Sequence, residues 1–231
     1  YIYGLLPTDF GRVSDAMMES ATDNSVYTWE NNSIYCITNG LWSPLKRVDD
    51  GWGFWDGVRS ANLFLENFDP KVLERFQYNE DYDEMIDKAS KFSLEVRFLR
   101  AFYLFELAKR YGDIPLITRT YTQEEINSVR KTSFADVIDF IAKECTEITR
   151  EGGLPEDGVR GETGRVTKGA ALALKSRALL YAASDLHNPA HDLTKWEAAA
   201  KAAYEVIKMN KYQLPNVSTD PLYSDLGGNE V

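Results

Sequence analysis

One segment of the sequence limits the possible folds more than any other. It reads SLEVRFLRAFYLFELAKRYGDIPLI and covers residues 93–117. Its apolar residues recur at three- and four-residue steps and form two stripes, with Phe102 between them, so the apolar arc is wider than that of an ordinary surface helix. We therefore expect a helix over residues 94–111 that is packed on two sides, with Phe98 and Phe105 almost fully buried.

Both ends of this helix carry boundary signals. Ser93 is placed to cap its start, and Lys109 and Arg110 suit the negative end of the helix dipole in its last turn. Gly112 can adopt the left-handed conformation that ends many helices, and Pro115 prevents continuation. The sequence therefore bounds this helix on both sides.

Three further segments downstream show the same helical spacing of apolar residues. They start at Ser133, Thr167 and Thr194, and each of these hydroxyl side chains can cap a first turn. Thr194 also stands three residues before Glu197, which is the spacing of a capping box. The last helix, up to Asn210, is expected to pack through one face. The members of this face are Trp196, Ala199, Ala203, Val206 and Ile207.

Two helices expected nearer the start of the chain, roughly residues 5–20 and 56–68, have weaker signals. No convincing hairpin pattern separates the longer elements, and the connections between them are short or moderate. This pattern favours stacked helical pairs over a βαβ fold. The expected fold class is therefore all-α, in a single scaffold that extends over residues 1–231.

The irregular span 22–55 lies between these two weaker helices and is longer than a compact helical domain needs for a connection. It contains the stretch WENNSIYCITNGLWSP, whose apolar residues keep neither the helical nor the strand period for long. Long loops of this kind are usually functional or flexible. We interpret residues 22–55 as an inserted aromatic loop.

Composition and charge exclude several classes of function. The formal charge of −10 predicts an acidic surface that repels phosphate backbones, so nucleic-acid binding is not expected. No run of about 18 uncharged apolar residues marks a membrane span. Cys36 and Cys145 fit no metal or redox spacing, which favours two small buried side chains, although a single disulfide is also compatible with the sequence.

The sequence contains no convincing catalytic or metal motif. His187 and His191 are four residues apart, but Pro189 argues against the helix that would bring them onto one face, and no third ligand is evident. The acidic segment 79–84 is spaced like a calcium loop but lacks the glycine at position six, so we expect a solvated loop. No carboxylate has the setting and partner that glycoside hydrolysis requires. We expect no metal, no cofactor and no catalytic residue.

Several blocks, read in order, resemble the helical scaffold of the SusD/RagB-like surface lipoproteins, which capture nutrients for outer-membrane uptake. The main blocks are EVRFLRAFYLFELAKRYGDIPLIT, TSFADVIDFIAKECTEI, GRVTKGAALALKSRALLYAASDLHN and WEAAAKAAYEVIKMNKYQL. The resemblance covers nearly the whole chain and implies helices arranged like irregular tetratricopeptide repeats. The family's leader and lipid-bearing cysteine are missing before Tyr1, and its members continue beyond Val231, so we expect a processed or truncated amino-terminal half.

The resemblance also implies a function. It indicates a non-catalytic, surface-exposed lipoprotein of the bacterial outer membrane, which delivers oligosaccharide or another polymer fragment to a SusC-like, TonB-dependent transporter. The membrane contact would be made only through a lipid anchor that this chain lacks. Two other interpretations remain open, a helical-repeat adaptor that binds only proteins and an α-helical carbohydrate-active enzyme.

A sugar site needs flat aromatic surface together with amide or carboxylate groups, because sugar rings present apolar C–H faces and hydroxyls. The loop at 22–55 supplies both kinds of group, and the family's ligand-binding aromatics commonly come from such loops. The candidate ligand-binding residues are Tyr27, Trp29, Asn31, Asn32 and Trp42. Trp29 and Trp42 are alternatively packing residues, and Trp52 and Trp55 are expected to pack against the following helix.

Overall fold

The computed structural model of the protein describes residues 1–7, 12–157 and 164–213. The long helices of this part are α2 (Phe54–Asn67), α3 (Tyr82–Tyr111), α5 (Phe134–Ile148), α6 (Lys168–Ala183) and α7 (Leu193–Lys208). The shorter elements are η1 (Ile2–Leu5), β1 (Arg12–Val13), β2 (Ala16–Met17), η2 (Met18–Ala21), α1 (Tyr35–Thr38), η3 (Pro70–Phe76) and α4 (Gln123–Ile126).

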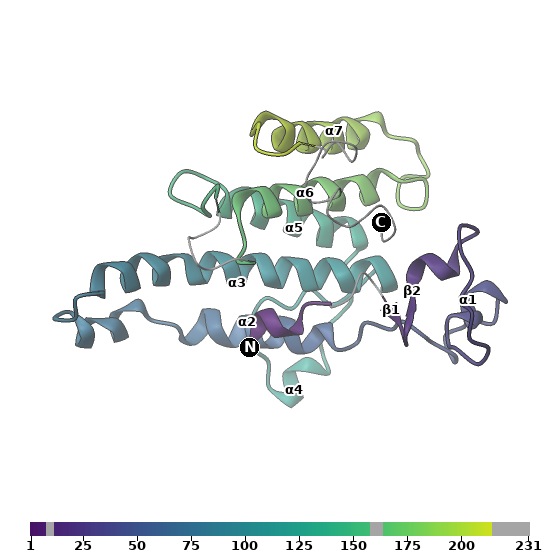
Figure 1. The fold of residues 1–231 in the computed structure, drawn as a ribbon, viewed down its shortest axis with the longest axis horizontal. Helices are drawn as coiled ribbons and strands as arrows, with labels where there is room; N and C mark the ends of the chain where they lie inside the picture. The colour runs from purple at the N-terminus through teal and green to yellow at the C-terminus, as the bar shows by residue number, and fades with distance from the viewer. Residues whose placement is uncertain (8–11, 158–163, 214–231) are drawn as a thin grey trace, which may run out of the picture.

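The long helices are stacked in the order in which they follow one another along the chain. Helix α2 packs against α3, α3 against α5, α5 against α6, and α6 against α7 (Figure 1). Such nearest-neighbour packing is typical of helical-repeat proteins, in which each unit contacts mainly the next. The expected all-α fold of irregular, tetratricopeptide-like helical pairs is confirmed.

Helix α3 is longer than the sequence pattern predicted. Its end is as expected, because Gly112 adopts a positive φ of 67° immediately after the last turn. The predicted start at Ser93 is wrong, since residues 82–92 contain neither proline nor glycine and the helix continues through them. Asp83 and Glu84 therefore lie in its first turn, near the positive end of the helix dipole, and not in an acidic loop.

The main hydrophobic core surrounds the second half of α3. Phe98 is 8% exposed and Phe105 is fully buried, which confirms the burial expected from the doubly apolar pattern. The core residues come mainly from α2, α3, α5 and α6. Its largest fully buried members include Val58, Leu99, Tyr103, Leu104, Leu107, Val137, Ile138, Ile141 and Ile148. The central helix is thus packed on both sides.

Two of the four predicted helix caps are correct, and the one at Ser93 is wrong because α3 begins at Tyr82. The Ser133 hydroxyl accepts a hydrogen bond from the Asp136 backbone N–H, and the Thr167 hydroxyl accepts one from Ala170. At α7 the prediction is wrong, because Asp192 is the cap and accepts from the Thr194 N–H at 2.9 Å. A carboxylate two residues earlier thus takes the role that was expected for the threonine.

The predicted packing face of α7 is also partly wrong. Ala199 and Ala202 are buried against α6, but Trp196 is 43% exposed and Ile207 is 69% exposed. The best-buried residues of α7 are thus alanines, whereas Trp196 and Ile207 remain substantially exposed.

The helix predicted over residues 5–20 is not formed in the described part of this range; residues 8–11 lie outside the described residues. A two-stranded ribbon of β1 and β2 turns at Ser14, whose φ is 53°. The apolar residues of this range belong to two separate hydrophobic clusters, so they do not form the single apolar face that a helix would need. Tyr3 and Leu6 pack against the main core, whereas Val13 and Ala16 belong to a second one.

We call residues 12–50 the side lobe, which extends from one end of the helical stack (Figure 1). Val13, Ala16 and Ile34 form its small core, with partly buried aromatic and aliphatic residues around them. Cys36, in the lobe, and Cys145, in α5, are both buried and both free. The structure therefore supports two small buried side chains and not a disulfide.

A buried ionic network joins α3 to α5. Arg97 donates two hydrogen bonds to the Glu144 carboxylate, at 2.7 and 3.1 Å, and Arg100 donates a third at 3.1 Å. Arg100 also donates to the Asn62 side chain and to the Thr118 carbonyl. Burial alone would raise the pKa of Glu144, but the two guanidinium groups outweigh it and lower this pKa below its usual value.

None of the helices in the described part of the chain combines the length and the apolar character that a bilayer-spanning helix requires.

The contact between Gly57 of α2 and Tyr103 of α3 leads to a stability prediction. A Cβ atom added at Gly57 would lie 2.5 Å from the ring of Tyr103, which is fully buried and donates a hydrogen bond to the Ile2 carbonyl. We expect Gly57→Ala to lower the free energy of unfolding by about 1–3 kcal/mol, despite the roughly 1 kcal/mol that a helix gains when glycine is replaced. Chemical denaturation of the intact protein measures this.

Gly53→Ala is the matched control, because no heavy atom lies within 4 Å of its added Cβ and its φ is −61°. Its free energy of unfolding should change by no more than about 0.5 kcal/mol. If both variants were equally stable, the contact between Gly57 and Tyr103 would not limit the packing of α2 on α3.

Candidate functional site

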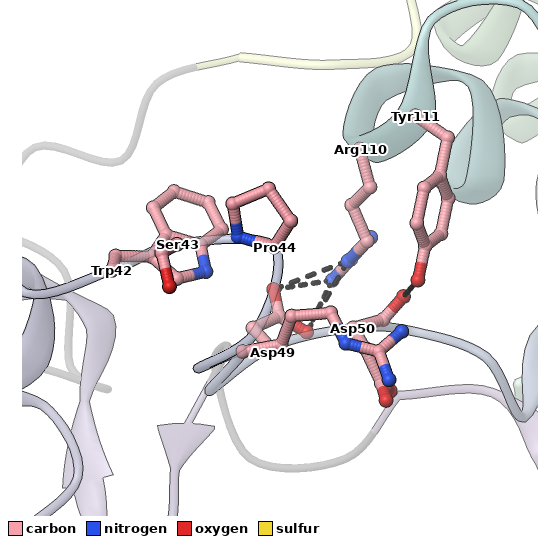
Figure 2. A pocket seen from close by; sticks show the side chains of 8 residues that line it. Trp42, Ser43, Pro44, Asp49, Asp50, Arg110 and Tyr111 are labelled. Atoms are coloured by element: carbon pink, nitrogen blue, oxygen red, sulfur yellow. Dashed lines mark hydrogen bonds and ion pairs between the residues drawn. The ribbon is translucent and has the colours of Figure 1, made fainter.

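An open pocket of about 460 Å³ lies where the side lobe meets the carboxyl end of α3. It is lined by Trp42, Ser43, Pro44, Arg47, Asp49, Asp50, Arg110 and Tyr111. Trp42 and Pro44 lie across from Arg110 and Tyr111, with Asp49 and Asp50 below them (Figure 2). The pocket therefore combines one wall from the lobe with one wall from the scaffold.

Arg110 holds the two walls together. Its Nε and Nη2 atoms donate to both carboxylate oxygens of Asp49 at 2.7–3.2 Å (Figure 2). Its Nη1 atom donates to Glu106 at 2.7 Å. Burial alone would lower the pKa of Arg110, but these carboxylates raise it above its usual value. This bidentate pair fixes both the orientation of the Asp49 carboxylate and its distance from the Arg110 guanidinium. Asp49 is therefore held in one place on the scaffold.

Two further contacts fix the same turn. The Tyr111 hydroxyl donates to the Asp50 backbone carbonyl at 2.7 Å. Gly51 has a φ of 58°, and a Cβ atom added there would lie 2.7 Å from the Cδ atom of Arg110. Only a glycine suits this turn, because it combines a left-handed conformation with close approach to a side chain. The pocket floor is therefore well defined before any ligand binds.

The exposed aromatic surface of the pocket is supplied by Trp42, which is 55% exposed. Trp52 lies just outside the lining, with its ring edge-on to those of Tyr111 and Trp55 at centroid distances of 5.9 and 6.4 Å. The predicted packing of Trp52 and Trp55 against the start of α2 agrees with these contacts, although Trp52 is also 59% exposed.

The structure does not bring the other sequence-predicted site residues into this pocket. Tyr27 and Trp29 form their own edge-on aromatic pair in the side lobe, with ring centroids 6.1 Å apart, and Trp29 is 72% exposed. Asn31 has a φ of 52°, and the Asn32 side chain accepts a hydrogen bond from the Ile34 N–H at 2.9 Å. Both asparagines therefore have a local structural role, in the turn that precedes α1.

Several lining residues were not identified from the sequence. Arg110 and Tyr111 were interpreted as the last turn of a helix, and Asp49 and Asp50 as part of an irregular loop. The contacts between these pairs join residues that are 61 positions apart. No local pattern signals such a contact, so only the three-dimensional arrangement identifies them.

The site offers little to acid–base or metal chemistry. The Asp49 carboxylate is held by Arg110, which leaves it poorly placed as a proton acceptor. In the described ranges, no three His, Cys, Asp or Glu side chains are grouped so that they could hold a metal ion. His187 stacks on Phe134 at a centroid distance of 3.6 Å, and His191 lies in a turn with a φ of 53°.

A second hollow of about 410 Å³ lies among α5, α6 and α7. Its apolar lining consists of Leu172 and Met209, and the ammonium group of Lys175 is already paired with Glu205 at 2.8 Å. It has no aromatic wall. We therefore regard the pocket at Trp42 as the stronger candidate for a ligand site.

A helical-repeat scaffold with an open, aromatic-lined pocket has the architecture of a ligand-binding protein. Residues 10–180, well over half of the chain, match the model of a SusD-like protein family described as starch-binding and associating with the outer membrane. The chain belongs to this SusD-like family.

Solved structures of the same family support this assignment. A SusD-like protein from Bacteroides fragilis is 28% identical, with a TM-score of 0.69 over 92% of this chain and 37% of its own. A SusD-like carbohydrate-binding protein from the same organism is 26% identical, with a TM-score of 0.64 over 87% of this chain and 35% of its own. A laminarin-binding SusD-like protein is 27% identical, with a TM-score of 0.57 over 75% of this chain and 33% of its own.

The chain thus spans little more than a third of the length of these solved relatives. No curated protein matches it.

Proposed function

We propose that the protein captures glycans at the cell surface without catalysing a reaction on them. The observation that carries this proposal is the pocket in which the exposed Trp42 faces a floor preorganised by Arg110 and Asp49. An aromatic face can stack on the C–H face of a sugar, and the polar groups around it can bind hydroxyls. Membership of a family described as starch-binding supports the same ligand class.

The wider setting follows from the family and belongs to the same proposal. The protein is a lipid-anchored component of the bacterial outer membrane and transfers its ligand to a SusC-like, TonB-dependent transporter. The family description, which places its members at the outer membrane, supports this setting. Copurification of the transporter with the intact protein tests it, and a protein found only in the periplasm would contradict it.

Two other functions make different predictions. A helical-repeat adaptor would bind no glycan, and its tryptophan fluorescence would not change in a glycan panel. A carbohydrate-active enzyme would release reducing ends from one of the panel members. The proposed function predicts a fluorescence change without such release.

Loss of the Trp42 side chain should weaken glycan binding. We expect Trp42→Ala to lower the affinity about tenfold or more, since stacking on an aromatic ring contributes roughly 1–3 kcal/mol in the analogous case of nucleic-acid bases and each 1.4 kcal/mol is a factor of ten. The measurement is isothermal titration of the intact protein with a glycan first identified on an array. Circular dichroism should show that the helices are unchanged.

Trp196→Ala is the matched control, because Trp196 is also exposed but lies on α7, far from the side lobe (Figure 1). Its affinity should equal that of the unaltered protein. Trp29→Ala tests whether the ligand extends along the lobe to the pair of Tyr27 and Trp29. If Trp42→Ala bound normally and Trp29→Ala did not, the site would lie at that pair. Normal binding by both variants would contradict a glycan site in this part of the protein.

A further inference from the structure

The charged groups that line the pocket are not equally available to a ligand. Four lining side chains carry a charge: Arg47, Asp49, Asp50 and Arg110. Arg110 and Asp49 neutralise each other through four hydrogen-bond contacts, and Arg110 is further occupied by Glu106. A ligand therefore meets Arg47 and Asp50 as the free charges of the pocket.

Arg47 is an unpaired cation within the described ranges of the chain. It is exposed, and its side chain makes no hydrogen bond or ion pair with any residue described there. A guanidinium group presents five N–H donors in a planar fork and has no acceptor. The residues of the described ranges thus occupy none of the donors of Arg47, which lines the same pocket as Trp42.

Asp50 has a different role. One of its carboxylate oxygens accepts a hydrogen bond from the Trp52 backbone N–H at 3.1 Å, and the Tyr111 hydroxyl occupies its backbone carbonyl. The second carboxylate oxygen has no donor in the described part of the protein. It can accept a hydrogen bond from a sugar hydroxyl, so the pocket offers a cationic donor and an anionic acceptor on one lining.

We propose that this pocket selects sugars that carry an anionic substituent, a carboxylate or a sulfate, which pairs with Arg47 while the ring stacks on Trp42. This inference rests on the proposed function. The planar fork of arginine matches the geometry of such oxyanions in a bidentate pair, and the hydroxyls of the same sugar satisfy Asp50. A neutral sugar offers the Arg47 guanidinium only uncharged hydroxyl oxygens as hydrogen-bond acceptors.

The acidic composition of the protein does not oppose this selection at short range. The chain carries a formal charge of −10, but charges more than about 10 Å apart are largely screened at 0.1 M salt. An anionic sugar bound at Trp42 therefore responds mainly to the charges that line the pocket. Its affinity should fall as the salt concentration rises, unlike that of a neutral sugar.

The test uses oligosaccharides in pairs that differ only in charge. One pair is an oligogalacturonate and its methyl ester, and the other is a sulfated galactan oligosaccharide and its desulfated form. We expect the anionic member of at least one pair to bind the intact protein about tenfold or more tightly than its neutral partner. Arg47→Gln should abolish this difference, and Arg47→Lys should retain part of it. Arg59→Gln, at an exposed arginine of α2 outside the pocket, is the control.

The outcomes separate this inference from the proposed function. A preference within the first pair identifies a carboxylate, and one within the second pair identifies a sulfate. Equal binding of neutral and anionic members, unchanged by Arg47→Gln but weakened by Trp42→Ala, would overturn the inference and leave glycan capture intact. Failure of every neutral and anionic member to bind would overturn the inference, and glycan capture would be overturned only if the glycan array also showed no bound member.

Discussion

Replacing Glu144 by glutamine should lower the free energy of unfolding by about 3–5 kcal/mol, because it leaves the buried Arg100 guanidinium without its counter-charge and leaves Arg97 with Glu147 alone. The side chains of Glu144 and Arg100 are each 10% exposed, and Glu144 accepts hydrogen bonds from both Arg97 and Arg100. In the described part of the protein, the Nε of Arg100 is already buried without a partner. Glu147 contacts Arg97 only, so Arg100 has no second carboxylate in the described part of the protein to replace the lost one. Urea denaturation of the intact protein measures the change.

Glu147→Gln is the matched control for this prediction. Glu147 also pairs with Arg97, at 2.5 Å, but its side chain is 29% exposed and it does not contact Arg100. Partly exposed ion pairs contribute about 1 kcal/mol or less. Equal losses in the two variants would show that burial does not set the strength of this network.

The Glu144 carboxylate also makes the free energy of unfolding depend on pH, and the sign of this dependence follows from its lowered pKa. The folded state lowers the pKa of Glu144, so its stabilising contribution is fully present above the unfolded value of about 4.3 and is lost as the pH falls through the lower, folded value. The difference in unfolding free energy between the unaltered protein and Glu144→Gln should therefore be constant near neutral pH and shrink below about pH 4. A difference that grew in acid would contradict this assignment.

Truncation of Phe105 to alanine should cost about 3–5 kcal/mol, as is typical for a large aromatic side chain removed from a core. Phe105 is fully buried, packs edge-on against Tyr181 of α6 at a centroid distance of 5.2 Å, and lies beneath the guanidinium of Arg177. Its loss leaves a cavity beside Tyr181 that the surrounding structure fills only in part. Thermal and urea denaturation both report this loss.

Phe102→Ala serves as the comparison for Phe105→Ala, because Phe102 lies on the same helix but is only partly buried. The aromatic contacts of Phe102 are with Phe98 and Tyr103, both within α3. Its truncation should cost clearly less. An equal or larger cost at Phe102 would mean that the packing of α3 depends as much on the residue between its two stripes as on Phe105.

Much of the scaffold could be predicted from the sequence because its signals are local. The helices that follow Ser133 and Thr167 have apolar residues at helical spacing and a capping hydroxyl within the same segment. The range 5–20 was misassigned because its apolar residues divide between two cores, and spacing alone cannot show this. The early start of α3 was missed because residues 82–92 are polar enough to resemble a loop.

The candidate site was less predictable than the scaffold. Aromatic and amide content predicted both Trp42, which lines the pocket, and Asn32, whose side chain accepts a hydrogen bond within a turn. Arg110 joins the site only because α3 ends where the side lobe begins, and Asp49 meets it across 61 positions. Such a contact depends on tertiary structure, so the chemistry of single segments does not identify it.

The separate core of the side lobe has a consequence for how this protein can change over evolutionary time. Val13, Ala16 and Ile34 stabilise the lobe without belonging to the main core, and Arg110 and Tyr111 hold its last residues on the scaffold. Mutations in the lobe can therefore alter one wall of the pocket while the stability of the helical stack is preserved, as is common for loops on a rigid scaffold. Natural selection can act on ligand choice and on folding separately, so a new specificity need not begin with a weakened protein.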